Sequence, residues 1–242
     1  MKIIDLSKPI QFNAGDPRFM QVCIKHKRHG AAKLLVWLLG LPRRLFPKDF
    51  VGWADDTITK MGVHATTHID APWHYGPTSG GQPAQTIDEI PLEKCIGPGV
   101  VLDMTNKADD DPITVSDMEI ALAKTGANID ENTIVLIRTG RDTLMGTKAF
   151  WTRGTGMSAA ATEWLLDRGP TVMGIDQWGW DLPFRAQIRE LLHMPIRPAL
   201  SDSVRLPKER VVASCLRPGD LRAERQIPSP LVDPHDGRAA VE

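Results

Sequence analysis

The chain has 242 residues, of which 42% are hydrophobic and 24% are charged, a normal balance for one globular domain with a substantial apolar core. Its formal net charge of −1 gives no global attraction to nucleic acid or to an anionic membrane. The longest apolar run, residues 34–39, is too short to span a bilayer. We therefore expect neither nucleic acid nor a membrane as a partner.

The cysteines and the N-terminal residues indicate in which cellular compartment the protein is located. The three cysteines are odd in number and widely spaced, so they form neither a disulfide framework nor a CxxC metal site. Asp5 places an acid where a signal peptide would be apolar. Both observations favour a cytoplasmic protein.

In the first quarter of the chain, two segments favour regular structure. The rough alternation of residues 2–6 predicts a first strand. Residues 31–39 have a helical pattern that ends at Gly40, with Pro42 beyond it, which is a normal stop signal. The short basic cluster at residues 25–29 is interpreted as a solvated surface.

The middle of the chain alternates between apolar strands and amphipathic helices. Expected strands and helices are, in order, strand 97–104, helix 116–124, strand 133–138, helix 158–168 and strand 171–176. Ser158 can cap the second helix, which Gly169 ends. This order, with short connections, predicts an α/β domain with a mixed β core and flanking helices.

The composition changes after Phe184. No aromatic residue follows it, prolines and arginines punctuate the sequence, and residues 211–214 form the one passable strand. Such a composition buries little apolar surface. We therefore expect a domain over residues 1–187 and a divergent, partly disordered C-terminal region over residues 188–242.

Three of the seven histidines lie within residues 64–74. His64, His68, Asp70 and His74 all occupy even positions, so an extended chain would place them on one face. A helix would turn Asp70 by about 200° from His68, and Pro72 would remove a helical hydrogen bond. We therefore predict a strand over residues 64–70 and a turn over residues 72–74.

These side chains suit a catalytic metal ion. Two imidazoles and a carboxylate favour Zn²⁺, Mn²⁺ or Fe²⁺, and three protein ligands leave positions for water and substrate. His74, one strand period further on, could carry a proton. The same residue types form the triad of non-haem Fe(II) oxygenases, but the last histidine of those sites usually comes from a distant strand. Unrelated structural histidines are the remaining interpretation.

The pattern His64-x-x-Thr67-His68-x-Asp70-x-Pro72-x-His74 resembles the motif of the metal-dependent cyclase family of hydrolases, which includes bacterial kynurenine formamidases and isatin hydrolases. The resemblance covers about residues 3–184, with supporting segments at residues 4–10, 86–92 and 174–181. It implies a swivelling β/β/α fold in a homodimer or higher homo-oligomer. It also implies hydrolysis of an amide or lactam bond of a small aromatic substrate, as in tryptophan catabolism through kynurenine.

By the same resemblance, His64, His68 and Asp70 are the ligands of Zn²⁺ or Mn²⁺, and His74 is the catalytic acid and base. Four aromatic residues could line an aromatic substrate pocket, and for the tryptophans core packing is the alternative. These residues are Phe12, Trp73, Trp178 and Trp180.

The sequence departs from the family pattern at three places. Thr66 stands where the family usually has glycine, which could strain the backbone, and Asn13 stands where formamidases tend to carry tryptophan. The family also supplies a later histidine with a glutamate twelve residues on, whereas here Arg205 stands twelve residues after His193. A second interpretation is therefore a catalytically impaired relative that binds a metal or small ligand without turnover.

Overall fold

The structure, a computed structural model, describes residues 4–193 and 211–214. The chain forms two compact units. The first consists of residues up to Lys8, Thr67–Met145 and the residues from Ala149 onward; the second consists of Pro9–Thr66 with Gly146–Lys148. Sheets and helices alternate, which confirms the predicted α/β class.

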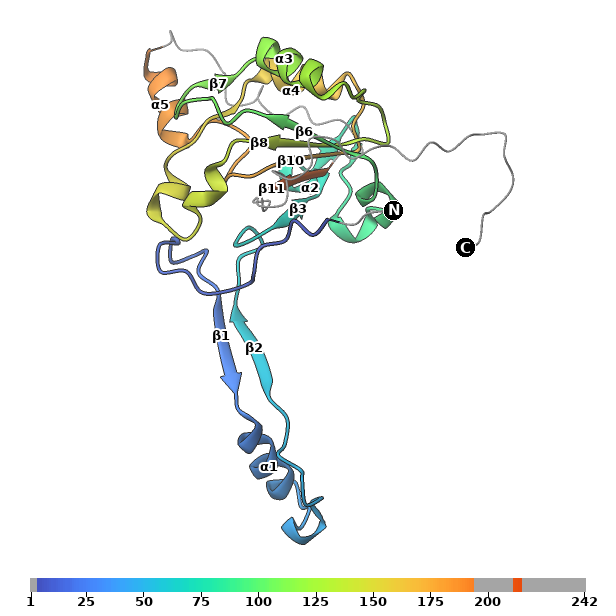
Figure 1. Ribbon diagram of the computed structural model, residues 1–242, viewed down its shortest axis with the longest axis vertical. Helices are drawn as coiled ribbons and strands as arrows, with labels where there is room; N and C mark the ends of the chain where they lie inside the picture. The colour runs from blue at the N-terminus through green and yellow to red at the C-terminus, as the bar shows by residue number, and fades with distance from the viewer. Residues whose placement is uncertain (1–3, 194–210, 215–242) are drawn as a thin grey trace, which may run out of the picture. The chain divides into compact units, whose positions relative to one another are not determined.

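A five-stranded sheet forms the centre of the first unit (Figure 1). In spatial order its strands are β3 (His68–Asp70), β11 (Val211–Ser214), β10 (Val172–Ile175), β8 (Ile134–Arg138) and β6 (Gly99–Asp103). The last four are parallel to one another, and β3 runs antiparallel to β11. The strands predicted at residues 97–104, 133–138, 171–176 and 211–214 are therefore confirmed, and β8 lies between β10 and β6.

Strand residues alternate between two apolar layers, as the two-residue period of a strand requires. Val135 and Ile137 of β8 join the larger core cluster, together with Met118 of α3 (Val115–Thr125) and Leu165 of α4 (Ala159–Leu166). Leu136, between the two β8 residues, joins the smaller cluster. The sheet is thus buried on both faces, which explains the continuous apolar runs of its strands.

Capping residues set the ends of both flanking helices. At α3, the Thr114 side chain accepts a hydrogen bond from the Asp117 backbone N–H, and Gly126 ends the helix in the left-handed conformation. At α4, the Ser158 side chain accepts from the Ala161 N–H at 3.2 Å. Both helices predicted from the sequence are confirmed, with α4 ending two residues earlier than expected.

Short elements connect these layers. They are α2 (Pro72–Tyr75), the two-residue strands β4 (Thr78–Ser79), β5 (Gln82–Pro83), β7 (Pro112–Ile113) and β9 (Gly156–Met157), and the 3₁₀ turns Ile87–Glu89, Leu92–Cys95, Arg141–Leu144 and Lys148–Trp151. β4 pairs with β5, and β7 pairs with β9.

In the second unit, strands β1 (Cys23–Lys27) and β2 (Asp55–Lys60) form an antiparallel ribbon. Helix α1 (His29–Leu38) follows β1 and is followed by the 3₁₀ turn Arg43–Leu45. Figure 1 shows α1 beyond one end of the ribbon. The helix predicted at residues 31–39 is confirmed, and the basic cluster at residues 25–29 is exposed, including the part of it that lies in β1.

One expectation is wrong: residues 4–6, the described part of the strand predicted at residues 2–6, form no strand. The Asp5 carboxylate there accepts the Ser7 backbone N–H at 2.9 Å. Helix α5 (Phe184–His193) spans the boundary expected at residue 187, and the division into two regions stays a prediction. The disorder expected at residues 194–210 and 215–242 concerns positions outside the described residues.

In the described part of the chain, no helix is long and apolar enough to cross a membrane.

Candidate metal centre

His68 and Asp70 are the first and last residues of β3. Their two-residue separation places both side chains on one face of the strand, as predicted. The His68 Nε2 and Asp70 Oδ2 atoms lie 3.6 Å apart, and the side chains are only 11% and 13% exposed. A shielded carboxylate beside an imidazole is a suitable start for a divalent-metal site.

Backbone pairing holds β3 in place. Asp70 lies opposite Val212 and His68 lies opposite Ser214 in the antiparallel pair with β11. Just before the strand, the Thr67 hydroxyl accepts the Lys8 backbone N–H at 3.0 Å. Both ends of the segment that carries His68 and Asp70 are therefore fixed by parts of the chain distant in sequence.

His74 lies on α2, a single helical turn that starts at Pro72. Proline suits this first position because its fixed φ matches the helix. The N–H that proline lacks would have no partner within the helix at this position. The His74 N–H donates to the Ala71 carbonyl at 2.9 Å, and the Trp73 N–H donates to the Gln85 carbonyl at 3.0 Å. The turn predicted at residues 72–74 is thus a short helix, which leaves His74 exposed.

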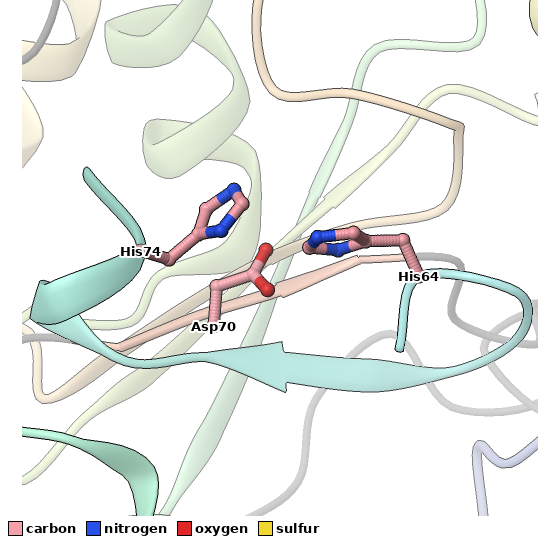
Figure 2. Close-up of side chains that lie close together, drawn as sticks. All are labelled: His64, Asp70 and His74. Carbon is pink, nitrogen blue, oxygen red and sulfur yellow. The ribbon is translucent and has the colours of Figure 1, made fainter. Parts of the chain in front are cut away.

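Three side chains of the segment converge. One ligand atom from each of His64, Asp70 and His74 lies within 4.8 Å of the others. Figure 2 shows the Asp70 carboxylate between the two imidazole rings. This donor set of two imidazoles and one carboxylate fits Zn²⁺ or Mn²⁺.

The grouping differs in one member from the ligand set that the sequence suggested. His74, expected to carry protons, belongs to it, whereas His68, expected to be a ligand, lies beside Asp70. The metal-ligand role of His68 and the acid–base role of His74 stay predictions.

One extended strand over residues 64–70 does not form. The Ala65 N–H donates to the Gly62 carbonyl at 3.0 Å, so His64 lies in a turn and β3 begins only at His68. The alternation of side chains along a strand therefore places His68 and Asp70 on one face, but it does not apply to His64. Thr66 does not adopt a positive φ, which among the described non-glycine residues only Asp110 does. Its backbone therefore does not show the strain that a residue in place of glycine could cause.

Tyr75, which the sequence reasoning did not single out, packs beside this group. Its ring meets the His74 imidazole edge to face, with centroids 5.1 Å apart. Burial raises the pKa of its phenol far above the ordinary value, and the nearby carboxylates Asp70 and Asp181 raise it further. Tyr75 therefore stays protonated. The sequence feature that could have pointed to Tyr75 is that the chain's one tyrosine directly follows His74.

A second buried carboxylate, Asp176, has a structural role. It accepts the Thr139 N–H and hydroxyl at 2.6 Å each and the Gly140 N–H at 2.8 Å. Burial raises the pKa of this carboxyl although these hydrogen bonds oppose the rise. Asp176 thereby ties the end of β10 to the turn that follows β8.

The four aromatic residues expected to bind substrate lie in different environments. Phe12 and Trp73 are 58% and 61% exposed. The Trp178 ring contacts the Trp151 ring at a centroid distance of 4.2 Å. Trp180 packs against the larger core and donates its indole N–H to the Thr162 hydroxyl at 3.0 Å. Core packing thus describes Trp180, and a substrate role for each of the four stays a prediction.

The fold and the converging side chains define an α/β protein with a candidate His/Asp metal centre. Comparison with family models matches residues 4–182 to the Cyclase family. Because this match covers most of the chain, the protein belongs to the cyclase family, as its motif predicted.

Solved structures with the same fold are distant in sequence. A crystal structure of a novel cyclase is 19% identical with a TM-score of 0.63, over 90% of this chain and 76% of that one. Isatin hydrolase A from Ralstonia solanacearum is 22% identical with a TM-score of 0.60, over 92% and 81%. A predicted metal-dependent hydrolase from Bacillus stearothermophilus is 21% identical with a TM-score of 0.55, over 91% and 84%. No curated protein matches the chain.

Proposed function

We propose that this protein is a metal-dependent hydrolase that cleaves an amide or lactam C–N bond of a small aromatic substrate. The observation that carries the proposal is the convergence of His64, Asp70 and His74 in a member of the cyclase family. Isatin hydrolases among the structural neighbours support a lactam as the substrate class.

The chain's own residues would divide the work between holding a cation and moving a proton. His64, His68 and Asp70 would hold Zn²⁺ or Mn²⁺, and such an ion supplies a Lewis acid and lowers the pKa of bound water. The exposed His74 imidazole would accept a proton from the attacking water. It would then deliver that proton to the leaving nitrogen as the C–N bond breaks, giving a carboxylic acid and an amine.

An aromatic pocket and a homo-oligomer are part of the proposal. Of the four candidate aromatic residues, Phe12 and Trp73 are 58% and 61% exposed and are therefore available to contact a substrate ring. The assembly into a homodimer or higher homo-oligomer, the cytoplasmic location and a place in tryptophan catabolism have their support in the family resemblance.

Metal analysis together with a hydrolysis panel tests the activity. The full chain, loaded separately with Zn²⁺ and Mn²⁺, is assayed on isatin, an N-formyl aryl amine and an aryl lactone, and its metal content is measured by mass spectrometry. We expect bound metal and hydrolysis of the lactam or the formyl amide. Absence of both would contradict the proposal.

The same assay, extended with a sample loaded with Fe²⁺ and a measurement of dissolved oxygen, separates the two other candidates. Stoichiometric metal without hydrolysis of any substrate would indicate a relative that binds metal without turnover. Oxygen consumption with Fe²⁺ would instead indicate an oxygenase.

A further inference from the structure

The His74 side chain lies on the surface, on a helix of a single turn. That helix, α2, consists of Pro72–Tyr75, and His74 is exposed on it. The χ2 angle of a histidine has broad minima, so an exposed imidazole can turn in several directions. A group that transfers protons is effective only when it is held in one geometry. If His74 has this role, a contact must fix the direction of its ring.

The neighbouring residue Tyr75 makes such a contact. The centroids of the His74 and Tyr75 rings are 5.1 Å apart, and the two planes are inclined at 82°. This is the edge-to-face arrangement that aromatic pairs prefer. Adjacent residues of a helix point in directions about 100° apart and do not normally face each other. The contact is therefore a particular feature of this turn and not a general consequence of a helical backbone.

The Tyr75 ring, unlike the His74 ring, is anchored in the protein. It packs against the larger core cluster, in which Met118 of α3 and Leu165 of α4 are fully buried. Close packing in such a core leaves a ring little room to move. The exposed imidazole thus touches a ring whose own position is set by the central sheet and its flanking helices.

Backbone hydrogen bonds hold the turn that carries both rings. The Trp73 N–H donates to the Gln85 carbonyl at 3.0 Å, and the Ala84 N–H donates to the Pro77 carbonyl at 3.1 Å. The chain before and after the two rings is therefore tied to the segment that contains β4 and β5. With the backbone fixed in this way, a single ring contact is sufficient to select one side-chain rotamer.

We propose that Tyr75 is a positioning residue, whose ring holds the His74 imidazole in the orientation that faces the Asp70 carboxylate. Ligand atoms of His74 and Asp70 lie within 4.8 Å of each other, and Figure 2 shows the carboxylate beside this ring. The effect on catalysis rests on the proposed function, in which His74 moves the proton. The Tyr75 phenol takes no part in that transfer.

Nuclear magnetic resonance tests the contact directly, because Tyr75 is the chain's one tyrosine. In the full chain with ring-labelled tyrosine and bound Zn²⁺, all labelled ring protons belong to Tyr75, and His74→Ala identifies the His74 signals. We expect a nuclear Overhauser effect between the two rings and another between the His74 ring and the Asp70 methylene. Absence of the effect between the rings would overturn the proposal, whether or not the protein hydrolyses any substrate.

Two substitutions at position 75 separate the ring from its bulk. Tyr75→Phe keeps the ring and should keep both Overhauser effects. Tyr75→Leu leaves an apolar side chain in the core but removes the ring. The effect between His74 and Asp70 should then fall about threefold, because the imidazole spreads over the three staggered χ1 wells. An unchanged effect in Tyr75→Leu would show that the tyrosine ring does not orient His74.

Turnover gives a second readout on the substrate that the wild type hydrolyses. In Tyr75→Leu we expect kcat to fall about tenfold, because the edge-to-face contact is lost. The KM should not change, because Tyr75 is not proposed to contact the substrate, and Tyr75→Phe should restore kcat. A chain that hydrolyses nothing would contradict the proposed function, and the Overhauser effects would still decide the role of Tyr75.

A matched variant separates positioning from a general loosening of the core. Trp164 of α4 is another partly buried aromatic residue that packs against the same cluster. Trp164→Leu should lower the Tm, measured by circular dichroism, but leave kcat and both Overhauser effects unchanged. Metal content is measured in every variant. An equal fall of kcat in Trp164→Leu and Tyr75→Leu would assign the loss to the core and overturn the proposal.

Discussion

Asp70 is the residue on which the candidate metal centre depends most. Its carboxylate belongs to the converging group and also lies 3.6 Å from His68. An asparagine has nearly the same shape but lacks the charge that a divalent cation requires from its ligands. The replacement therefore separates the effect of charge from the effect of packing.

We expect Asp70→Asn to lose bound Zn²⁺ or Mn²⁺ and at least a hundredfold in hydrolysis rate, because a charged ligand is replaced by a weak neutral one. Metal content and turnover are measured on the same preparation. Asp167→Asn, at the exposed C-cap of α4, is the matched control and should keep both. Full metal content in Asp70→Asn would rule out Asp70 as a ligand.

His68 and His74 can be distinguished by their effects. If His68 is a ligand and His74 carries protons, His68→Ala loses metal, whereas His74→Ala retains metal and loses turnover, typically a hundredfold or more for an acid–base group. Metal analysis and the pH dependence of the rate measure the two effects. The reverse pattern would make His74 the ligand, in agreement with the grouping in the structure.

At the scale of the elements, the helices and strands that could be predicted are those marked by a capping residue or by a continuous apolar run. Ser158 caps α4 as predicted, and the apolar run at residues 133–138 forms strand β8. The strands β1 and β2 escaped prediction because their residues are mostly charged or polar and nearly all exposed, so no apolar alternation marks them.

The candidate centre was predictable only in part, for a similar reason. Alternation along a strand relates residues within that strand, so it placed His68 and Asp70 together. It cannot describe a turn, and His64 lies in a turn. The proximity of His74 depends on the helical turn at Pro72, and the proximity of Tyr75 depends on tertiary packing.

The capping box of α3 has a predictable pH dependence. Burial alone would raise the pKa of Asp117, but hydrogen bonds from Thr114 and the contact with Lys107 outweigh it and lower the pKa. The folded pKa thus lies below the unfolded value of about 3.9. This contribution to stability is present above that pH and is lost as pH falls through the folded pKa.

Asp117→Asn should therefore reduce the free energy of unfolding by up to about 1 kcal/mol at pH 7, because the variant loses the negative charge at the helix N-terminus and the carboxylate that accepts from Thr114. The difference from the wild type should start to shrink below about pH 4, where the unfolded carboxylate takes up a proton, and should vanish below the lower folded pKa, where the folded carboxylate is neutral too. Urea unfolding at pH 7 and pH 3 measures it. Glu119→Gln, on an exposed position of the same helix, is the control. A difference that does not depend on pH would assign the effect to packing.

For the whole molecule, metal binding should be coupled to stability. A ligand that binds only the folded state stabilises it by about 2.7 kcal/mol at a concentration of one hundred times Kd. We expect Zn²⁺ or Mn²⁺ to raise the Tm, a chelator to reverse the rise, and Asp70→Asn to show neither effect. Differential scanning calorimetry measures the shift, and an equal rise in Asp70→Asn would place the stabilising ion elsewhere.

The position of β11 in the sheet affects the order in which the protein can form. This strand is the last described element of the chain, yet it lies between β10 and β3. On the ribosome, where the N-terminal part of a chain emerges first, β3 has no neighbour in this sheet until residues 211–214 have been made. Until then the edge of β10 is also open to wrong pairing. The strand that carries His68 and Asp70 therefore gains its partner in this sheet only after residues 211–214 have been made, long after its own residues.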